Sequence, residues 1–270
     1  MITSTSNAQV KQVNALAKRA KARRESGLFL VEGEKMFDEL PKKRLYRVYV
    51  TEGFLRQQGE RAERLLAGCR YETVTDEVMR AMSDTQTPQG ILALCRQFSY
   101  PLSDVLMGKN GRTEKQQVPH LMFLETLQDP GNLGTILRAG EGAGITGVIM
   151  NSATADIYNP KVIRSTMGSI YRVPFAYTED LGAALLEAKR TGIRLYAAHL
   201  DGEHSYDEEN YTGPTGFLIG NEANGLSRET ADMADCYIRI PMLGKVESLN
   251  AAVAASILMY ETARQRRKRS

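Results

Sequence analysis

Three stretches in the second half of the chain combine glycine with asparagine, serine, glutamate and arginine, at residues 132–138, 220–225 and 240–250. Each follows an apolar run with the pattern of a strand. Small residues allow the backbone to approach a ligand closely, and the few polar side chains supply directional contacts. This combination predicts a small-molecule site and favours an enzyme.

The first stretch lies where a strand passes through an Asp-Pro-Gly-Asn turn into a helix. Asn132 and Arg138 are six residues apart, close to two helical turns, which brings them to related faces near the helix start. An arginine there can hold a phosphate with two parallel hydrogen bonds. The structural alternative makes Asn132 the N-cap and Arg138 an ordinary surface arginine.

The other two stretches offer Glu222 and Ser248. Glu222 is a candidate for catalysis or, alternatively, a loop or helix-capping carboxylate. Ser248 precedes a run of Ala, Val and Leu, so it is also a candidate N-cap of the last helix.

Gly142, Gly144 and Gly147 match the GxGxxG fingerprint of dinucleotide-binding proteins. That fingerprint requires a strand before it and a helix after it, so that a pyrophosphate meets the helix N-terminus. Here a helical pattern precedes the glycines and a strand pattern follows. We therefore interpret them as the end of a helix and exclude a nicotinamide-dependent enzyme.

The elements that would position these residues alternate between short apolar strands and helices. In the second half, strands are predicted at 120–125, 147–150, 194–199, 216–219 and 237–240, and helices at 132–143, 161–166, 180–191, 227–232 and 248–266. This alternation predicts a parallel sheet covered on both faces. The first half opens with an amphipathic helix ending near Gly27 and continues as a smaller α/β unit.

A length of 270 residues favours two domains. We expect an N-terminal domain at 1–100, a polar and Gly-containing linker at 101–118, and a C-terminal domain at 119–270.

Basic residues are concentrated at the two ends of the chain. Residues 1–25 and 261–270 together carry a net charge of +9, whereas the rest carries −6. A polyanion such as nucleic acid is a reasonable partner for the ends, although such charge can also serve solubility alone.

The three cysteines are scattered, without CxxC spacing, and the three histidines form no ligand triad, so neither disulfides nor a metal site is expected. The start of the chain lacks a signal-peptide pattern, and no apolar run is long enough for a membrane span. We expect a soluble, cytoplasmic protein.

Together the three stretches resemble the three motifs of the SpoU (TrmH) family of RNA ribose methyltransferases, part of the SPOUT superfamily. The matching segments occur in the family's order: DPGNLG at 129–134 with Arg138, LIGNEANGL at 218–226, and IPM at 240–242 with SLNAAVA at 248–254. More loosely, FLVEGE at 29–34 and TPQGI at 87–91 resemble the ribosomal-protein-like substrate-binding domain of two-domain members.

The resemblance implies an α/β catalytic domain with a C-terminal trefoil knot, S-adenosyl-L-methionine as cofactor, and a homodimer through the catalytic domain. The general rarity of knots would argue against one. Cofactor contacts carried over from the family fall on Gly220, Ile240 and Leu249.

Methyl transfer to a ribose 2′-hydroxyl requires a rigidly held methylsulfonium, an aligned hydroxyl oxygen and help in removing the proton. In the family the counterpart of Arg138 has been proposed as the base, but a guanidinium stays protonated at accessible pH. We therefore expect Arg138 to fix the nucleotide's phosphate, with Asn132 and Ser248 orienting the hydroxyl. Glu222 would orient Arg138 or relay the proton, and Asn250 would shape the cofactor loop.

The resemblance leaves the substrate open. The two-domain layout favours ribosomal RNA over tRNA. The alternatives are a relative that methylates a base nitrogen, and a catalytically silent RNA-binding or ribosome-assembly protein.

Overall fold

In the computed structural model, which describes residues 1–109 and 117–268, the chain divides into two compact units. The first unit contains residues 1–98 and 156–171, and the second contains residues 99–155 and 172–270. The segment 156–171 therefore leaves the second half of the sequence to pack with the first unit.

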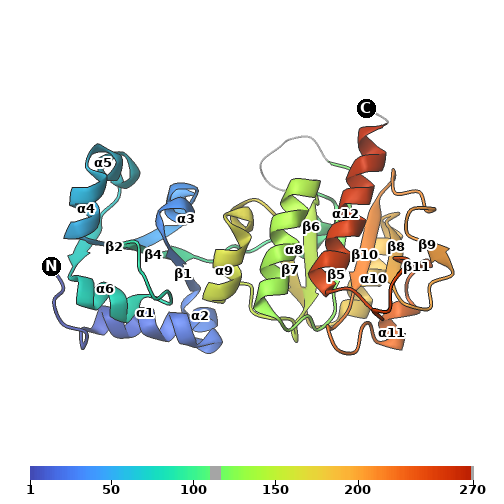
Figure 1. Cartoon of the computed structure of the whole chain (residues 1–270), viewed down its shortest axis with the longest axis horizontal. Coiled ribbons are helices and arrows are strands. Elements are labelled where there is room, and N and C mark those ends of the chain that lie inside the picture. The colour runs from blue at the N-terminus through green and yellow to red at the C-terminus, as the bar shows by residue number, and fades with distance from the viewer. Residues whose placement is uncertain (110–116, 269–270) are drawn as a thin grey trace. The chain divides into compact units, whose positions relative to one another are not determined.

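The first unit is built on a four-stranded mixed sheet in the order β1-β4-β2-β3. Strand β4 runs antiparallel to both of its neighbours, and β2 and β3 are parallel. In Figure 1, α1, α2 and α6 cover one face of this sheet, and α3, α4 and α5 lie on the other. The elements of this unit are α1 (Ala8–Lys18), α2 (Ala20–Ser26), β1 (Leu28–Glu32), α3 (Glu34–Asp38), η1 (Lys42–Arg44), β2 (Leu45–Thr51), α4 (Glu52–Gln58), α5 (Glu60–Leu66), β3 (Tyr71–Val74), α6 (Asp76–Met82), β4 (Ile91–Arg96), α9 (Pro160–Thr166) and η2 (Ser169–Tyr171).

The opening amphipathic helix is interrupted, because Arg19 adopts an extended conformation between α1 and α2. Val10, Val13 and Leu16 are buried in the core of this unit, as their helical spacing predicts. Arg23 is also buried: it pairs with Asp156 at 2.7 Å and donates to the carbonyl of Leu16. One of the six basic residues of the first 25 is therefore a structural cation.

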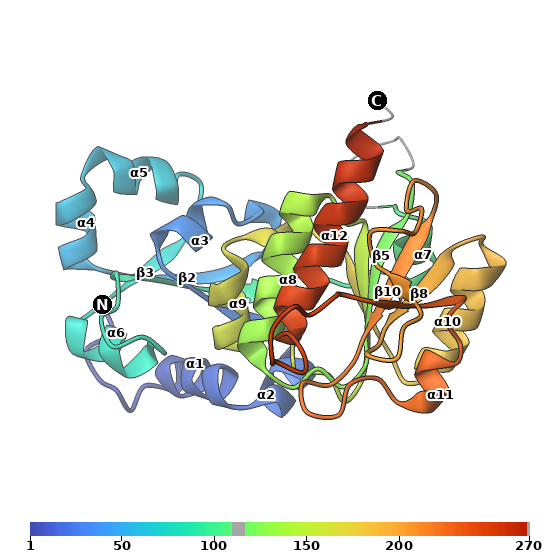
Figure 2. The same cartoon turned by 45° about the vertical axis from the view of Figure 1, so that its right-hand side comes forward.

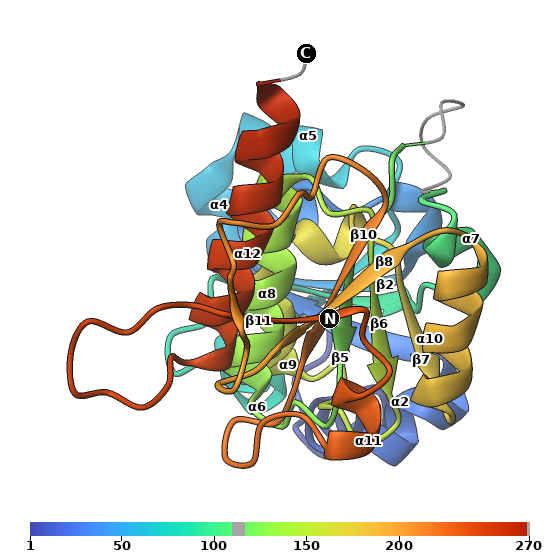
Figure 3. The ribbon, with the colours of Figure 1, turned by 90° about the vertical axis from the view of Figure 1, so that its right-hand side faces the viewer.

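The second unit contains a seven-stranded parallel sheet in the order β7-β6-β5-β10-β8-β11-β9. Helices α8 and α12 lie on one side of it, and α7 and α10 lie on the other (Figure 3). The elements are α7 (Leu102–Leu106), β5 (His120–Leu124), α8 (Pro130–Ala143), β6 (Gly147–Asn151), β7 (Phe175–Thr178), α10 (Leu181–Arg190), β8 (Arg194–Ala198), β9 (His204–Ser205), β10 (Thr215–Ile219), α11 (Arg228–Ala231), β11 (Cys236–Arg239) and α12 (Ala251–Arg267). The predicted α/β class, with a parallel sheet covered on both faces, is confirmed, and the trefoil knot stays a prediction.

The direction of the chain reverses at the centre of this sheet. β5 and β10 are neighbours, but the chain passes from β5 outward to β6 and from β10 outward to β11 on the other side. In open parallel sheets such a switch point leaves a crevice at the carboxyl ends of the strands, where ligands bind. Of the three stretches singled out in the sequence, 132–138 forms the first half of α8 after the loop that follows β5, and the other two lie in the loops that follow β10 and β11.

Several elements differ from the sequence-based expectation. Strands β7 and β9 were not predicted. Within the expected linker 101–118, helix α7 buries Val105 and Leu106 in the core of the second unit. Residues 110–116 of that linker lie outside the described residues.

The Gly-rich stretch at 142–147 has the structural role that its order in the chain predicts. Gly144 caps the C-terminus of α8 in the left-handed conformation, with φ 76°, and strand β6 begins at Gly147. No pyrophosphate site at a helix N-terminus is formed by these glycines, and the interpretation of the GxGxxG match as the end of a helix is confirmed.

Among the described residues, no helix has the length and apolar character needed to cross a membrane. Cys69, Cys95 and Cys236 are free thiols.

Candidate active site

The three loops meet at the carboxyl edge of the parallel sheet, at the start of α8. Asp129 is the N-cap of α8, and its carboxylate accepts a hydrogen bond of 2.8 Å from the backbone amide of Asn132. Pro130 occupies the first helical turn, where a missing N–H costs nothing. Asn132 is therefore not the N-cap but a residue of the first turn, and its side chain is free for other contacts.

Glu222, in the loop after β10, connects that loop to the start of α8. Its carboxylate accepts hydrogen bonds from the backbone amides of Gln128 and Asp129, at 3.2 and 3.0 Å. It also accepts a 3.0 Å hydrogen bond from the Asn132 side-chain amide. Burial by itself would raise the pKa of Glu222, but the hydrogen bonds from Asn132 and the backbone outweigh it and hold the pKa below its usual range. Glu222 is therefore an ionised acceptor at neutral pH.

Asn250 brings the third stretch into the same network. Its side-chain oxygen caps α12 by accepting from the backbone amides of Ala252 and Val253. Its side-chain nitrogen donates to the side-chain oxygen of Asn132 at 2.9 Å. The expectation that Ser248 caps the last helix is wrong: α12 begins two residues later, because Asn250 provides the capping oxygen.

Helix α12 lies beside α8 (Figure 2), which holds Asn250 close to Asn132. One chain of contacts, from Asn250 through Asn132 to Glu222, thus joins residues from all three stretches. Each amide uses its oxygen toward one partner and its nitrogen toward another, so the orientation of both amides is fixed.

The loop after β10 is a tight turn that leaves no room for side chains at its start. A Cβ on Gly220 would lie 2.1 Å from the backbone carbon of Gly225. The backbones of Asn221 and Gly225 exchange two hydrogen bonds of 2.9 Å. The Asn221 side chain accepts from two amides inside the turn and donates to the carbonyl of Thr126. Gly220 is therefore required by packing.

The loop after β5 is also held from several directions. Thr126 has a positive φ of 56°, an unfavourable conformation for a β-branched residue, and the side chain of Asn151 bonds both its amide and its hydroxyl. Beside it, Glu125 accepts from the backbone and hydroxyl of Ser227 and from the hydroxyl of Thr230. Backbone strain held by surrounding contacts is typical of functional sites.

Two of the predicted catalytic residues are not part of this network. Arg138 is exposed on α8 and, within the part of the chain that the structure describes, makes no hydrogen bond or ion pair. The expected pairing of Glu222 with Arg138 is not present, since Glu222 contacts Asn132 instead. Ser248 is exposed in the loop before α12.

The loop between β11 and α12 fits the role of a cofactor-binding segment. Ile240, Met242 and Leu249 are half-buried and provide apolar surface. In the described residues, the backbone amides and carbonyls of 241–249 have no hydrogen-bond partner. An apolar surface with free backbone donors and acceptors suits a nucleoside-containing cofactor such as S-adenosyl-L-methionine.

The sequence motifs contain Asp129 and Asn221 but did not reveal that these residues, together with Glu125, position the loops. Asp129 could have been found, because Asp followed by Pro is a strong signal for an N-cap and first helical residue. Asn221 and Glu125 act through contacts 95 or more residues away in sequence, which no local pattern reveals.

Comparison with known protein families identifies both units. Residues 119–260 match the model of the SpoU rRNA methylase family, and residues 7–93 match that of the MRM3-like substrate binding domain. The chain is 30% identical to the 23S rRNA (guanosine(2553)-2′-O)-methyltransferase RlmP of Bacillus subtilis, over 96% of this chain and 97% of the relative.

Solved structures agree with this match over nearly the whole chain. An AdoMet-bound rRNA methyltransferase from Sinorhizobium meliloti superposes with a TM-score of 0.83 at 30% identity, covering 97% of each chain. The SpoU methyltransferase AviRb from Streptomyces viridochromogenes, in complex with AdoMet, gives a TM-score of 0.84 at 27% identity, covering 96% of this chain and 98% of the other.

The fold and the site define a two-unit RNA methyltransferase. The chain belongs to the SpoU rRNA methylase family, with an MRM3-like substrate-binding domain at its N-terminal end, and the resemblance found in the sequence is confirmed.

Proposed function

We propose that this enzyme transfers the methyl group of S-adenosyl-L-methionine to a ribose 2′-hydroxyl in 23S ribosomal RNA. The observation that carries the proposal is the continuous contact from Asn250 through Asn132 to Glu222, which joins the three stretches at the switch point of the sheet. The relative from Bacillus subtilis, whose name gives a 23S rRNA 2′-O-methyltransferase, supports ribosomal RNA over tRNA.

Gly220, Ile240 and Leu249 are the residues that would hold the cofactor, chiefly through the backbone of the loops after β10 and β11. When bound, S-adenosyl-L-methionine supplies an electrophilic methyl group on a positively charged sulfur. The protein's part is to hold both loops in fixed positions, which Asn221 and Asn250 do.

Arg138 would anchor the phosphate of the target nucleotide. Its exposed guanidinium has no hydrogen-bond or ion-pair partner among the described residues, so its N–H donors are open to a phosphate. Asn132 and Ser248 would orient the 2′-hydroxyl. Since Glu222 accepts three hydrogen bonds and lies against Asn132, it would act as a positioning residue for Asn132 rather than for Arg138.

We further propose a cytoplasmic homodimer formed through the second unit. Val253 and Tyr260 on α12 are each about half exposed, at 47% and 50%, which leaves apolar surface available on that helix. Sedimentation of the purified protein would test this, and a monomer at micromolar concentration would contradict it.

Cofactor binding can be tested at Gly220. Gly220→Ala should abolish S-adenosyl-L-methionine binding in calorimetry, because the added methyl would displace the backbone of Gly225. Gly213→Ala is the matched control, since a Cβ at Gly213 meets nothing within 4 Å. A wild-type protein that does not bind the cofactor, or a Gly220→Ala variant that binds it normally, would contradict the assignment.

The role of Arg138 can be tested with the conservative variant Arg138→Lys. We expect kcat/KM for methyl transfer to fall at least about tenfold, because lysine keeps the charge but loses the bidentate geometry. The melting temperature should not change, since Arg138 is exposed and makes no hydrogen bond or ion pair within the described residues. Near-full activity would remove Arg138 from phosphate recognition.

A further inference from the structure

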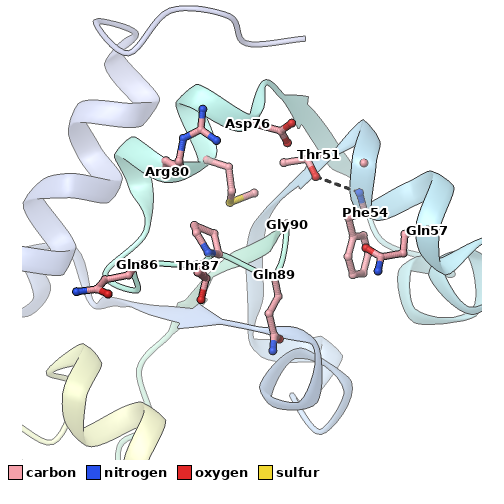
Figure 4. A pocket seen from close by; sticks show the side chains of 12 residues that line it. Thr51, Phe54, Gln57, Asp76, Arg80, Gln86, Thr87, Gln89 and Gly90 are labelled. Carbon is pink, nitrogen blue, oxygen red and sulfur yellow. Dashed lines mark hydrogen bonds between the residues drawn. The ribbon is translucent and has the colours of Figure 1, made fainter.

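The first unit contains a pocket that the proposed active site does not use. It has a volume of about 370 Å³ and lies where β2 and β3 end and β4 begins. Figure 4 shows that it is enclosed by the starts of α4 and α6 and by the loop 83–90.

The loop that forms one wall of this pocket is held rigidly. The Glu32 carboxylate accepts from the hydroxyls of Ser83 and Thr85 and from the backbone amide of Asp84. The Gln89 side-chain oxygen accepts a 2.9 Å hydrogen bond from the backbone amide of Glu34. These contacts fix the loop 83–90 at both ends, so the pocket is preformed.

The wall also depends on Gly90, where β4 approaches the start of α4. Gly90 has a φ of 82°, and a Cβ there would lie 2.7 Å from the Thr51 hydroxyl and 2.8 Å from the Phe54 Cβ. Only glycine combines this conformation with such a close approach. The backbone geometry of the pocket is therefore specified by the sequence.

The lining combines an apolar floor with a polar rim. Phe54 and Met79 are buried, with 4% and 2% of their surfaces exposed. Gln57, Arg80 and Gln86 are exposed, and their side chains have no hydrogen-bond partner among the described residues. A flat ring with donors and acceptors along its edge fits such a lining better than an aliphatic or fully charged ligand does.

The charge of the rim and the volume of the pocket further limit the class of ligand that fits. The Asp76 carboxylate lies on the same rim as Arg80, as Figure 4 shows, which disfavours an isolated phosphate. The remaining polar groups are neutral amides and hydroxyls. A volume near the lower end of the roughly 300–1,000 Å³ range of ligand pockets suits a single ring system rather than an extended ligand.

We propose that this pocket binds one unpaired nucleobase of the substrate RNA. This proposal rests on the proposed function, which identifies the RNA. It means that the first unit recognises the RNA through contact with a base. Glutamine side chains are suited to the edges of bases, because each offers a donor and an acceptor side by side.

Gly53 provides a direct test, because it lines the pocket and has room for a side chain. A Cβ there would lie 3.7 Å from the Thr51 hydroxyl and 4.0 Å from the Asp76 carboxylate, which are ordinary contacts. Gly53→Leu should fill the pocket, whereas Gly53→Ala, the matched control, should leave most of it open. Gln57→Ala removes a rim contact, and Gln58→Ala on the same helix is its control.

The measurement is filter binding of the full-length protein to an unmodified 23S rRNA transcript at several salt concentrations. We expect Gly53→Leu and Gln57→Ala to weaken binding about tenfold, the usual loss for one base contact, with an unchanged salt slope because no phosphate contact is removed. The two controls should bind within about twofold of the wild type. Calorimetry should give an unchanged affinity for S-adenosyl-L-methionine.

Wild-type affinity in both Gly53→Leu and Gln57→Ala, or a loss accompanied by a shallower salt slope, would overturn the proposal. If Gly53→Leu fails to fold, the comparison of Gln57→Ala with Gln58→Ala is sufficient to test the proposal. The binding measurement does not depend on catalysis. A wild-type protein that binds the transcript but transfers no methyl would therefore contradict the proposed function and still decide the role of the pocket.

Discussion

Asn132 lies between two partners that come from distant parts of the chain. Its nitrogen donates to Glu222, 90 residues away, and its oxygen accepts from Asn250, 118 residues away. The side-chain amide supplies a donor and an acceptor on one short planar group, and glutamine is the only other residue that carries the same amide, on a longer side chain. The contacts with Glu222 and Asn250 therefore require an amide at position 132, whether or not Asn132 also touches the substrate.

The dependence on Asn132 leads to a prediction with a defined pH dependence. Asn132→Asp would place a second carboxylate against Glu222, and each would raise the pKa of the other. The variant should be less stable than the wild type by about 1 kcal/mol at pH 8, a modest loss because the pair is exposed and screened. The deficit should shrink as the pH falls and one carboxyl takes up a proton. Thermal melting at pH 8 and pH 5 measures this.

The swapped pair provides the control for that prediction. In Asn132→Asp combined with Glu222→Gln, the glutamine amide can donate to the new carboxylate, so stability at pH 8 should recover in part. Methyl transfer should stay low in both variants, because a carboxylate replaces the Asn132 amide that we propose orients the 2′-hydroxyl. A double variant as unstable as the single one would show that these two side chains do not interact.

At the scale of elements, the N-cap residue of α12, Asn250, makes two separate contacts. Asn250 caps the helix with its oxygen and holds Asn132 with its nitrogen. Asn250→Asp should keep the cap and lose the donor, so stability should stay near that of the wild type while activity falls. Asn250→Ala should lose both, with a stability loss of about 1 kcal/mol.

Urea unfolding and methyl-transfer rates measured on both variants would separate these tasks. If Asn250→Asp retains full activity, the contact between Asn250 and Asn132 has no part in catalysis.

The elements show which parts of this structure a sequence can reveal. Strands β5, β8 and β10 were predicted because they are continuous apolar runs bounded by polar loops, and the order of helix and strand explained the glycines at 142–147. β9 has only two residues, and β7 is one short strand whose Phe175 and Ala176 are buried by neighbours far along the chain, so neither has a strong periodic signal. α7 was hidden in a segment whose polar composition indicated a linker.

For the site, the residues were predicted from the sequence but the contacts between them were not. The motifs identified Asn132, Glu222 and Asn250, but not how they pair, since pairing depends on the neighbouring positions of β5 and β10 in the sheet. The start of α12 was misplaced because Ser248 and Asn250 are both good N-cap residues. Only the position of the helix axis against α8 decides between them.

At the scale of the whole molecule, the basic ends of the chain are partly structural. Arg266 donates to the carbonyls of Tyr211, Val118, Pro119 and Gly213, and burial lowers its pKa to about 10. Arg264 pairs with Glu261. The exposed cations that remain for RNA at this end are Arg267 and Lys268, since residues 269 and 270 lie outside the described residues.

Because Arg267 and Lys268 are exposed, we expect the double variant Arg267→Gln, Lys268→Gln to bind RNA more weakly. The salt dependence of binding should also be less steep, and the melting temperature should not change. Arg266→Met, by contrast, should lower the melting temperature, because four carbonyls lose their donor. Salt-dependent filter binding and thermal melting measure the two effects. An unchanged salt slope in the double variant would remove this end from the RNA interface.

Buried His120 gives the fold a defined sensitivity to acid. Burial, with a smaller effect from Arg266, lowers the pKa of His120 to about 3, below its value of 6.5 in an unfolded chain. Above pH 6.5 His120 is neutral in both the folded and the unfolded chain, so it does not reduce the free energy of unfolding. As the pH falls from 6.5 toward 3, only the unfolded chain takes up the proton, and the free energy of unfolding decreases. His120→Leu should therefore reduce the loss of stability between pH 6.5 and pH 5 by up to about 2 kcal/mol. Urea unfolding at the two pH values is the test, and an unchanged loss would contradict it.

The most direct test of ribose methylation is to map 2′-O-methyl groups in the total RNA of a strain that lacks this protein. We predict that one 2′-O-methylated nucleotide disappears from 23S ribosomal RNA, returns with the wild-type protein, and returns to a lower extent with Arg138→Lys. An unchanged pattern of ribose methylation, or the loss of a methylated base instead, would contradict the proposed function.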